Sequence, residues 1–192
     1  MRIEAGEFRG RALLGPAKEA VARPITGLAR KSVFGTLQAW LAGGAVADLY
    51  CGTGTLGLEA ISRGAQHCWF AERERDTVDR LKQNIAALGV GDRATVWAGD
   101  VPGRLAGWLE ALPRALDVAF VDPPFEQARE WQWRLMESSV FVPLAGHLAP
   151  EGLVVLRTDR RTEVPERLGP LGVALMKTYG IMTVRFFAAE AP

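Results

Sequence analysis

The sequence has few cysteines, few histidines and no long apolar run. Its 192 residues include two cysteines, Cys51 and Cys68, and they form no Cys-x-x-Cys pair, so neither a disulfide framework nor a zinc site is indicated. The two histidines, His67 and His147, are interpreted as structural. Because no apolar stretch is long enough for a signal peptide or a membrane span, we expect a cytoplasmic protein with no membrane partner. From the cysteines and histidines we expect no metal site.

The chain also lacks a large net charge. Its formal charge is +1, and its 48% hydrophobic content is enough for a single packed core. The charge is uneven, however, because residues 1–40 hold seven basic side chains against three acidic ones. The basic residues are Arg2, Arg9, Arg11, Lys18, Arg23, Arg30 and Lys31. Such a basic arm could pair with a phosphate backbone, although a solvated polar terminus explains the same charges.

Short β-rich segments alternate with helical ones, which is typical of a parallel sheet covered by helices on both faces. We expect helices over Ala29–Leu41, Leu56–Ser62 and Thr77–Leu88, where apolar residues recur at helical spacing. The seven expected strands are Ala45–Tyr50, His67–Ala71, Ala94–Ala98, Val118–Val121, Leu153–Arg157, Val173–Thr178 and Met182–Ala188. Only residues 179–181 separate the last two strands, which is too short for a crossover, so these strands pair as an antiparallel hairpin.

A glycine turn follows the first strand, in the segment Asp48-Leu49-Tyr50-Cys51-Gly52-Thr53-Gly54-Thr55-Leu56-Gly57. Glycines at this place let a backbone approach a pyrophosphate, or the amino-acid end of S-adenosylmethionine, at a helix N-terminus. The carboxylate of Asp48 favours the second ligand, because it suits an ammonium group and repels a pyrophosphate. A glycine turn in an unrelated α/β protein is the alternative.

Two further carboxylates end the next two strands. Glu72 lies where a carboxylate can accept hydrogen bonds from both ribose hydroxyls of an adenosine, and Asp100 could accept from the adenine amine or cap a helix. The predicted cofactor site therefore comprises Asp48, Tyr50, Cys51, Gly52, Thr53, Gly54, Leu56, Gly57, Glu72, Arg73, Asp100 and Val101.

The fourth strand delivers Asp122-Pro123-Pro124-Phe125 at its carboxyl end. An exocyclic base amine is a poor nucleophile, because its lone pair is delocalised into the ring. Two acceptors on its N–H bonds would draw the amine out of plane, and the Asp122 carboxylate and the Pro123 carbonyl can supply them. Phe125 can stack on the extruded base, while Asp122 stabilises the positive charge that develops on the amine. We therefore predict methyl transfer to a base amine, with Asp122, Pro123, Pro124 and Phe125 as the catalytic residues.

At these residues the sequence resembles the RsmD-type 16S ribosomal RNA guanine-N2 methyltransferases, over nearly the whole chain. The likeness covers Arg2-Ile3, the segment from Gly6 to Arg11, the segment from Arg23 to Thr26, Arg30, Val33-Phe34, the glycine turn and the Asp-Pro-Pro-Phe string. The family usually has a second Thr and Asp-Arg where this chain has Ile25, Gly27 and Leu28, a difference that could weaken RNA contacts.

The resemblance implies a Rossmann-like, seven-stranded class I methyltransferase sheet, with six parallel strands and one antiparallel strand. It further implies a small N-terminal hairpin and helix in an RNA-binding arm over residues 1–40, followed by a catalytic domain over residues 41–192. It implies S-adenosylmethionine as donor and, as acceptor, a guanine of small-subunit ribosomal RNA in the assembled or assembling subunit. The arm residues implied to contact RNA are Arg9, Arg11, Arg23, Thr26 and Arg30.

Three other interpretations compete with this one. An adenine-N6 or cytosine-N4 DNA methyltransferase uses the same chemistry, but it usually carries a separate DNA-reading domain, for which this chain has no room. A noncatalytic RNA-binding assembly factor would be expected to have lost Asp122 or Phe125, and both are present. A nicotinamide dehydrogenase would share the glycine turn but would normally continue with parallel strands.

Overall fold

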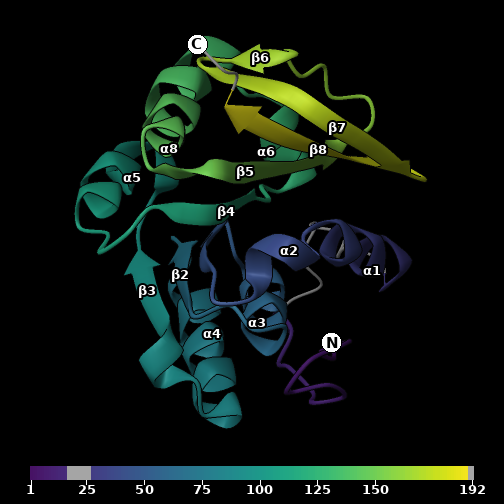
Figure 1. Ribbon diagram of the computed structural model, residues 1–192, viewed down its shortest axis with the longest axis vertical. Coiled ribbons are helices and arrows are strands. Elements are labelled where there is room, and N and C mark those ends of the chain that lie inside the picture. Colours follow the sequence, from purple (N-terminus) through teal and green to yellow (C-terminus); the bar gives the residue numbers. More distant parts are fainter. Residues whose placement is uncertain (17–26, 190–192) are drawn as a thin grey trace.

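The computed structural model describes residues 1–16 and 27–189. Within this part, eight strands form one sheet in the order β3-β2-β1-β4-β5-β8-β7-β6. Their bounds are Ala45–Leu49 (β1), His67–Glu72 (β2), Ala94–Ala98 (β3), Leu116–Val121 (β4), Leu148–Asp159 (β5), Arg167–Leu168 (β6), Leu171–Tyr179 (β7) and Met182–Ala189 (β8). The first five strands are parallel, and β8 pairs antiparallel with both β5 and β7 (Figure 1). The predicted α/β class I methyltransferase sheet is therefore confirmed, with one additional short strand.

Helices connect the parallel strands and cover both faces of the sheet. They are α1 (Gly27–Thr36), α2 (Gln38–Leu41), α3 (Thr55–Ser62), α4 (Arg75–Leu88), α5 (Val101–Glu110), α6 (Phe125–Arg129), α7 (Trp133–Met136) and α8 (Val142–Ala145), with a 3-10 turn at Gly91–Arg93 and a π-helical turn at Glu137–Phe141. None of the helices in the described ranges is long and apolar enough to cross a membrane.

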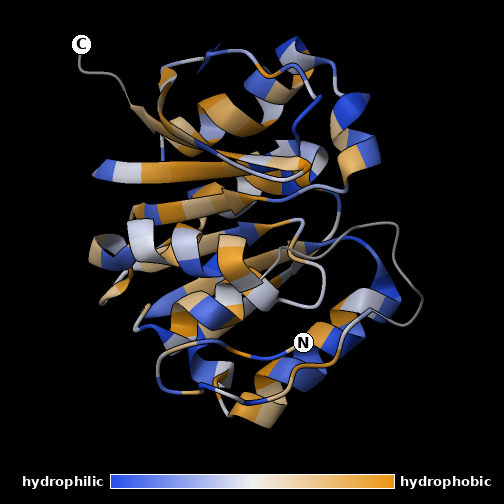
Figure 2. Cartoon of the chain, turned by 90° about the vertical axis from the view of Figure 1, so that its right-hand side faces the viewer, coloured by the Kyte–Doolittle hydropathy of each residue, from blue (hydrophilic) through white to orange (hydrophobic). Residues whose placement is uncertain are grey.

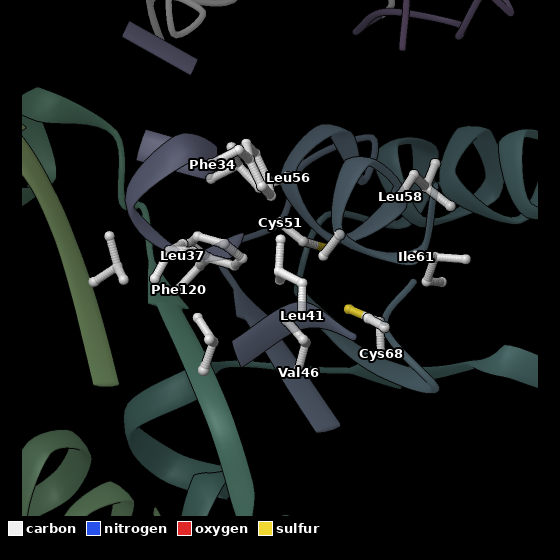
Figure 3. Close-up of a cluster of buried hydrophobic side chains, with 14 of the residues drawn as sticks. Phe34, Leu37, Leu41, Val46, Cys51, Leu56, Leu58, Ile61, Cys68 and Phe120 are labelled. Atoms are coloured by element: carbon white, nitrogen blue, oxygen red, sulfur yellow. The ribbon is translucent and has the colours of Figure 1, made fainter. Parts of the chain in front are cut away.

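The alternation of side chains along each strand divides the core into two layers. Val46 and Phe120 face a cluster with Phe34 of α1, Leu41 of α2 and Leu37 between these helices (Figure 3). Their neighbours along the same strands face a second cluster, which contains Leu105 and Leu109 of α5, Phe141, and Leu144 of α8. The central strands are largely apolar in Figure 2, as expected for strands that are buried on both faces.

The N-terminal segment forms a minimal hairpin that is fastened to the body. Arg2 and Ala12 form an antiparallel bridge, and the backbone N–H groups of Glu4 and Ala5 donate to the buried carboxylate of Glu59 on α3 at 2.8 and 3.1 Å. The Asn84 side chain bonds both the N–H and the carbonyl of Leu14. The hairpin is thus held against α3 and α4 by partly buried hydrogen bonds.

The structure corrects two expectations about these elements. The single helix expected over Ala29–Leu41 is wrong, because it breaks at Leu37 into α1 and α2. The hydroxyl of Thr36 donates to the Ser32 carbonyl, a back-bond that commonly bends helices. Strand β6 was not predicted because it is two residues long and lies at the sheet edge, paired with β7.

Candidate active site

The carboxyl ends of the parallel strands surround a cavity of about 290 Å³. The sheet order reverses between β1 and β4, and such a switch point leaves a crevice where α/β proteins bind ligands. Asp48, Glu72, Asp122 and Arg157 all line this cavity, from β1, β2, the end of β4 and β5 respectively. Residues far apart in the sequence therefore meet because parallel strands end at the same edge of the sheet.

The glycine turn links β1 to α3 through left-handed backbone at Gly52 and Gly54, where φ is 55° and 86°. At Gly54 a Cβ atom would lie 2.4 Å from Leu81 Cδ1, and at Gly57 it would lie 2.3 Å from Phe70 Cε1. Gly54 and Gly57 do not line the cavity. Their role in the structure is the close packing of the turn and α3 against β2 and α4.

Asp48 is fully buried beneath this turn. Its Oδ2 accepts a hydrogen bond from the Gly57 N–H at 2.7 Å, whereas Oδ1 has no partner among the described residues. Burial raises the pKa of Asp48 to about 8; the Gly57 hydrogen bond opposes the shift, and the charges of Asp122 and Glu72 add to it. Because this pKa lies close to neutral pH, a cation that binds in the cavity beside Asp48 would ionise the carboxyl group.

Glu72 is fixed by backbone hydrogen bonds at the end of β2. Its Oε2 accepts from Gly52 N–H at 3.0 Å, and its Oε1 accepts from the N–H groups of Arg73 and Glu74 at 2.8 and 2.9 Å. A carboxylate has about four acceptor positions. Backbone N–H groups take three of them, so Glu72 is oriented by the backbone and keeps one acceptor position, on Oε2, for a hydroxyl group in the cavity.

Tyr50 is the one non-glycine residue with positive φ in the described chain, at 60°. This costly backbone conformation directs the ring toward Trp131, with 5.8 Å between the ring centroids. The buried hydroxyl has no hydrogen-bond partner within residues 1–16 and 27–189. Its pKa is raised by burial and by the charge of Asp100, against the influence of Arg73. Tyr50 is therefore an unsatisfied polar group in the wall of the cavity.

Asp122 is bound by an arginine that the sequence did not indicate. Arg157 Nε donates to Asp122 Oδ1 at 2.5 Å, and the two side chains are 9% and 15% exposed. The same guanidinium lies over the Phe125 ring, 5.0 Å from its centroid. Arg157 thus touches both the acid and the ring of the Asp-Pro-Pro-Phe string. Only its position at the end of a strand, where other site residues also lie, could have indicated it.

Most of the predicted site residues gather at this cavity. The lining includes Asp48, Tyr50, Cys51, Gly52, Thr53, Leu56, Glu72, Arg73, Asp100, Val101, Asp122 and Pro124, together with the unpredicted Gln127 and Arg157. Pro123 does not line it, and Phe125 lines a neighbouring cavity instead. Asp100 lies at the N-terminus of α5, and its side chain makes no capping bond there. Arg73 Nη1 lies 3.8 Å from Asp100 Oδ1.

The arm residues that the family resemblance connects with RNA have different surroundings. Arg9 is exposed, and Arg11 Nη2 donates to the Ala87 carbonyl at 2.6 Å. Arg30 is 5% exposed and bonds the Glu4 carboxylate and the Arg2 carbonyl, so it is not available to a phosphate in this conformation. The expectation that Arg30 contacts phosphate therefore disagrees with its burial.

Some of the remaining arm positions fall within the described part of the chain and others do not. Arg23, Thr26 and Ile25 lie outside the described residues. Gly27 begins α1, and Leu28 is 77% exposed. The described residues contain no group of three or more His, Cys, Asp or Glu side chains that could hold a metal ion.

The sheet order, the glycine turn at the end of β1 and the acid at the end of β4 define a Rossmann-like class I methyltransferase fold. The chain belongs to the family described as "Conserved hypothetical protein 95", whose profile matches residues 1–188. The resemblance to RsmD-type proteins is confirmed by a relative named Ribosomal RNA small subunit methyltransferase D from Escherichia coli (strain K12), 28% identical over 100% of this chain and 91% of its own.

Other proteins are similar over most of their length. One is "Putative rRNA methyltransferase YlbH" of Bacillus subtilis (strain 168), 31% identical over 97% of this chain and 98% of its own. Among solved structures, the Thermus thermophilus hypothetical protein TTHA0928 superposes with a TM-score of 0.79 at 26% identity, covering 98% of this chain and 99% of that one. Escherichia coli yhhF superposes with a TM-score of 0.78 at 28% identity, covering 100% and 99%.

Proposed function

We propose that this protein transfers a methyl group from S-adenosylmethionine to the exocyclic N2 amine of a guanine in small-subunit ribosomal RNA. The observation that carries the proposal is the placement of Asp122 and Pro124 in the wall of the cavity that the glycine turn and Glu72 also line. Relatives named as ribosomal RNA methyltransferases over the full length of the chain support RNA as the substrate.

The donor fits the residues around the cavity. Asp48 Oδ1 and the Tyr50 hydroxyl are buried without partners in the described chain, and both residues line the cavity. We infer that Asp48 and the Gly52 turn hold the amino-acid end of the donor, that Glu72 accepts from one of its ribose hydroxyls, and that Asp100 and Val101 lie beside the adenine. When bound, S-adenosylmethionine supplies a methyl group on a positively charged sulfonium.

The acceptor amine would lie at Asp122. The Asp122 carboxylate would accept one N–H of the amine and the Pro123 carbonyl the other, so that the lone pair turns out of the ring plane; of these two residues Asp122 lines the cavity in this structure, and Pro123 follows it in the chain. As the amine becomes positively charged, the carboxylate stabilises that charge and then holds the proton that the amine loses. Phe125 would stack on the base and fix its plane.

Arg157 would orient the carboxylate for this task. Its Nε donates a hydrogen bond to Asp122 Oδ1, and its guanidinium packs over the Phe125 ring, so the positions of the acid and the ring are linked. Arg157 is thus a positioning residue: it acts through Asp122 and Phe125. A displacement of about 1 Å in such a group can cost about 100-fold in rate.

The substrate assignment is tested by offering the enzyme three acceptors. Small subunits that lack the modification, protein-free 16S RNA and duplex DNA are incubated with S-adenosylmethionine, and the methylated nucleoside is identified by mass spectrometry. We expect N2-methylguanosine in RNA, with the assembled subunit as the better substrate. N6-methyladenine or N4-methylcytosine in DNA would instead identify the DNA methyltransferase, and RNA binding without any transfer would identify the assembly factor.

A further inference from the structure

A second cavity of about 360 Å³ is lined by the last residue of the Asp-Pro-Pro-Phe string. Pro124 lines the first cavity, and the next residue, Phe125, lines the second. The remaining lining residues come from α6, from the end of β5 with the residues after it, and from the turn between β7 and β8: Glu126, Arg129, Asp159, Arg160, Arg161 and Ile181. We call these seven residues the basic cleft.

An ion pair between Asp159 and Arg129 lies in the wall of the basic cleft. Asp159 is buried, and its Oδ2 accepts from Arg129 Nη2 at 2.8 Å. Its Oδ1 accepts from the Arg161 N–H at 2.9 Å, and this backbone bond is the first cause of the lowered pKa of Asp159, with Arg129 adding to it. The charge of Arg161 also lowers this pKa, so Asp159 offsets part of the charge of Arg129 and Arg161, and the basic cleft keeps an excess of one positive charge over its two acids.

The rim of the basic cleft presents two further cations in a fixed loop. The Arg160 N–H donates to the Ile181 carbonyl at 2.8 Å, which ties the end of β5 to the β7–β8 turn. The side chains of Arg160 and Arg161 are exposed, and Glu126 is the one other acid in the lining. Ile181, which is 44% exposed, adds an apolar surface beside them. The rim is thus a positively charged, partly apolar surface next to the Phe125 ring.

We propose that the basic cleft binds the RNA backbone beside the extruded base, with Arg160 and Arg161 contacting its phosphates. This inference rests on the proposed function. A base that leaves its stack remains joined to its sugar and flanking phosphates, so a cationic surface beside the stacking ring meets the backbone of the same strand. A positive groove beside an aromatic ring is the arrangement by which proteins bind single-stranded nucleic acid.

The test compares three double variants with the wild-type protein, each saturated with S-adenosylhomocysteine. Arg160→Ala/Arg161→Ala removes both cations, and Arg160→Lys/Arg161→Lys keeps them. The matched control, Lys82→Ala/Arg104→Ala, removes the same charge from exposed positions on α4 and α5. Binding of protein-free 16S RNA is measured over a range of salt concentrations, and melting temperatures show that each variant folds.

Two lost phosphate contacts should weaken binding roughly tenfold at 0.15 M salt and reduce the slope of log K against log salt by about 1.4, because each contact to a single strand accounts for about 0.7. The lysine variant and the control should stay near wild type. Equal weakening in the alanine variant and the control, no change in either, or no RNA binding by the wild-type protein would overturn the proposal. A larger loss with single-stranded DNA of the same sequence would assign the cleft to DNA.

A methyl-transfer assay on the same proteins, with S-adenosylmethionine in place of S-adenosylhomocysteine, separates this inference from the proposed function. If the wild-type protein methylates ribosomal RNA while the alanine variant binds RNA normally, the basic cleft is wrongly assigned and the proposed function stands. If the alanine variant loses RNA affinity while no variant transfers a methyl group to any RNA, the cleft stands and the proposed function fails.

Discussion

Asp48→Asn should stabilise the free protein while weakening its affinity for the cofactor. The carboxyl group is fully buried with a pKa of about 8 against an ordinary 3.8. Between these two pH values the folded protein holds a proton that the unfolded chain releases. The free energy of unfolding of the wild-type protein therefore falls as the pH rises from about 4 to about 8, and this contribution is constant above pH 8. Asparagine does not titrate, and its amide oxygen can still accept from the Gly57 N–H. The advantage of the variant should therefore be absent near pH 4 and largest at pH 8 and above.

The shift sets the size of this advantage. At about 1.36 kcal/mol per pKa unit, the difference corresponds to at most about 6 kcal/mol above pH 8 and about 4 kcal/mol at pH 7. Because water in the cavity can solvate an ionised Asp48, we expect a measured gain between about 2 and 6 kcal/mol at pH 8. Urea unfolding of both proteins at several pH values between 4 and 9 measures it. An equal or lower stability of the variant at pH 8 would refute the reasoning.

Cofactor binding supplies the other half of this prediction. A cationic ligand at Asp48 would favour the ionised carboxyl, so wild-type protein should release a fraction of a proton when it binds S-adenosylhomocysteine near pH 7. Calorimetry in two buffers with different ionisation enthalpies detects such a release. Asp48→Asn should abolish it and bind the ligand more weakly. Identical heats in both buffers would show that the ligand does not ionise Asp48.

Other substitutions test the remaining parts of the site. Asp122→Asn should reduce turnover by about 100-fold or more while S-adenosylhomocysteine affinity stays near wild type; near-normal turnover would remove Asp122 from the mechanism. Phe125→Ala should weaken RNA engagement by roughly 1–3 kcal/mol, measured as an increase in KM for RNA, if stacking is its main role. Arg157→Met should lower kcat by about 10- to 100-fold, with partial recovery in Arg157→Lys; equal loss in both at unchanged melting temperature would show that charge at this position does not orient Asp122. Arg9→Ala should reduce the slope of log K for RNA binding against log salt by about the amount that one phosphate contact contributes, and an unchanged slope would exclude Arg9 from the RNA interface.

The sequence predicted the sheet well because its strands are strongly apolar and end in recognisable turns. Each of the seven expected strands is present, and the elements at Ala94–Ala98 and Met182–Ala189 differ from expectation by at most one residue. The short helices between Phe125 and Ala145 were not predicted, because runs of four or five residues carry too little periodicity.

The site was predictable where local motifs carry it. The glycine turn and the Asp-Pro-Pro-Phe string are contiguous in sequence, so most of the residues that line the first cavity could be named from them, while their chemical roles stay a prediction. Arg157 and the basic cleft could not be found in this way, because they depend on contacts between residues about 30 positions apart, such as Asp122 with Arg157 and Arg129 with Asp159. The burial of Arg30 was likewise invisible, since it depends on how the hairpin folds back over α1.

Nucleoside analysis of ribosomal RNA tests the central claim most directly. Small subunits from cells that lack this gene are incubated with the purified protein and S-adenosylmethionine, in parallel with the Asp122→Asn variant. We predict N2-methylguanosine in 16S RNA after treatment with the wild-type protein and almost none with the variant. A methylated base other than guanine, methylation of DNA but not RNA, or equal product from both proteins would contradict the proposed function.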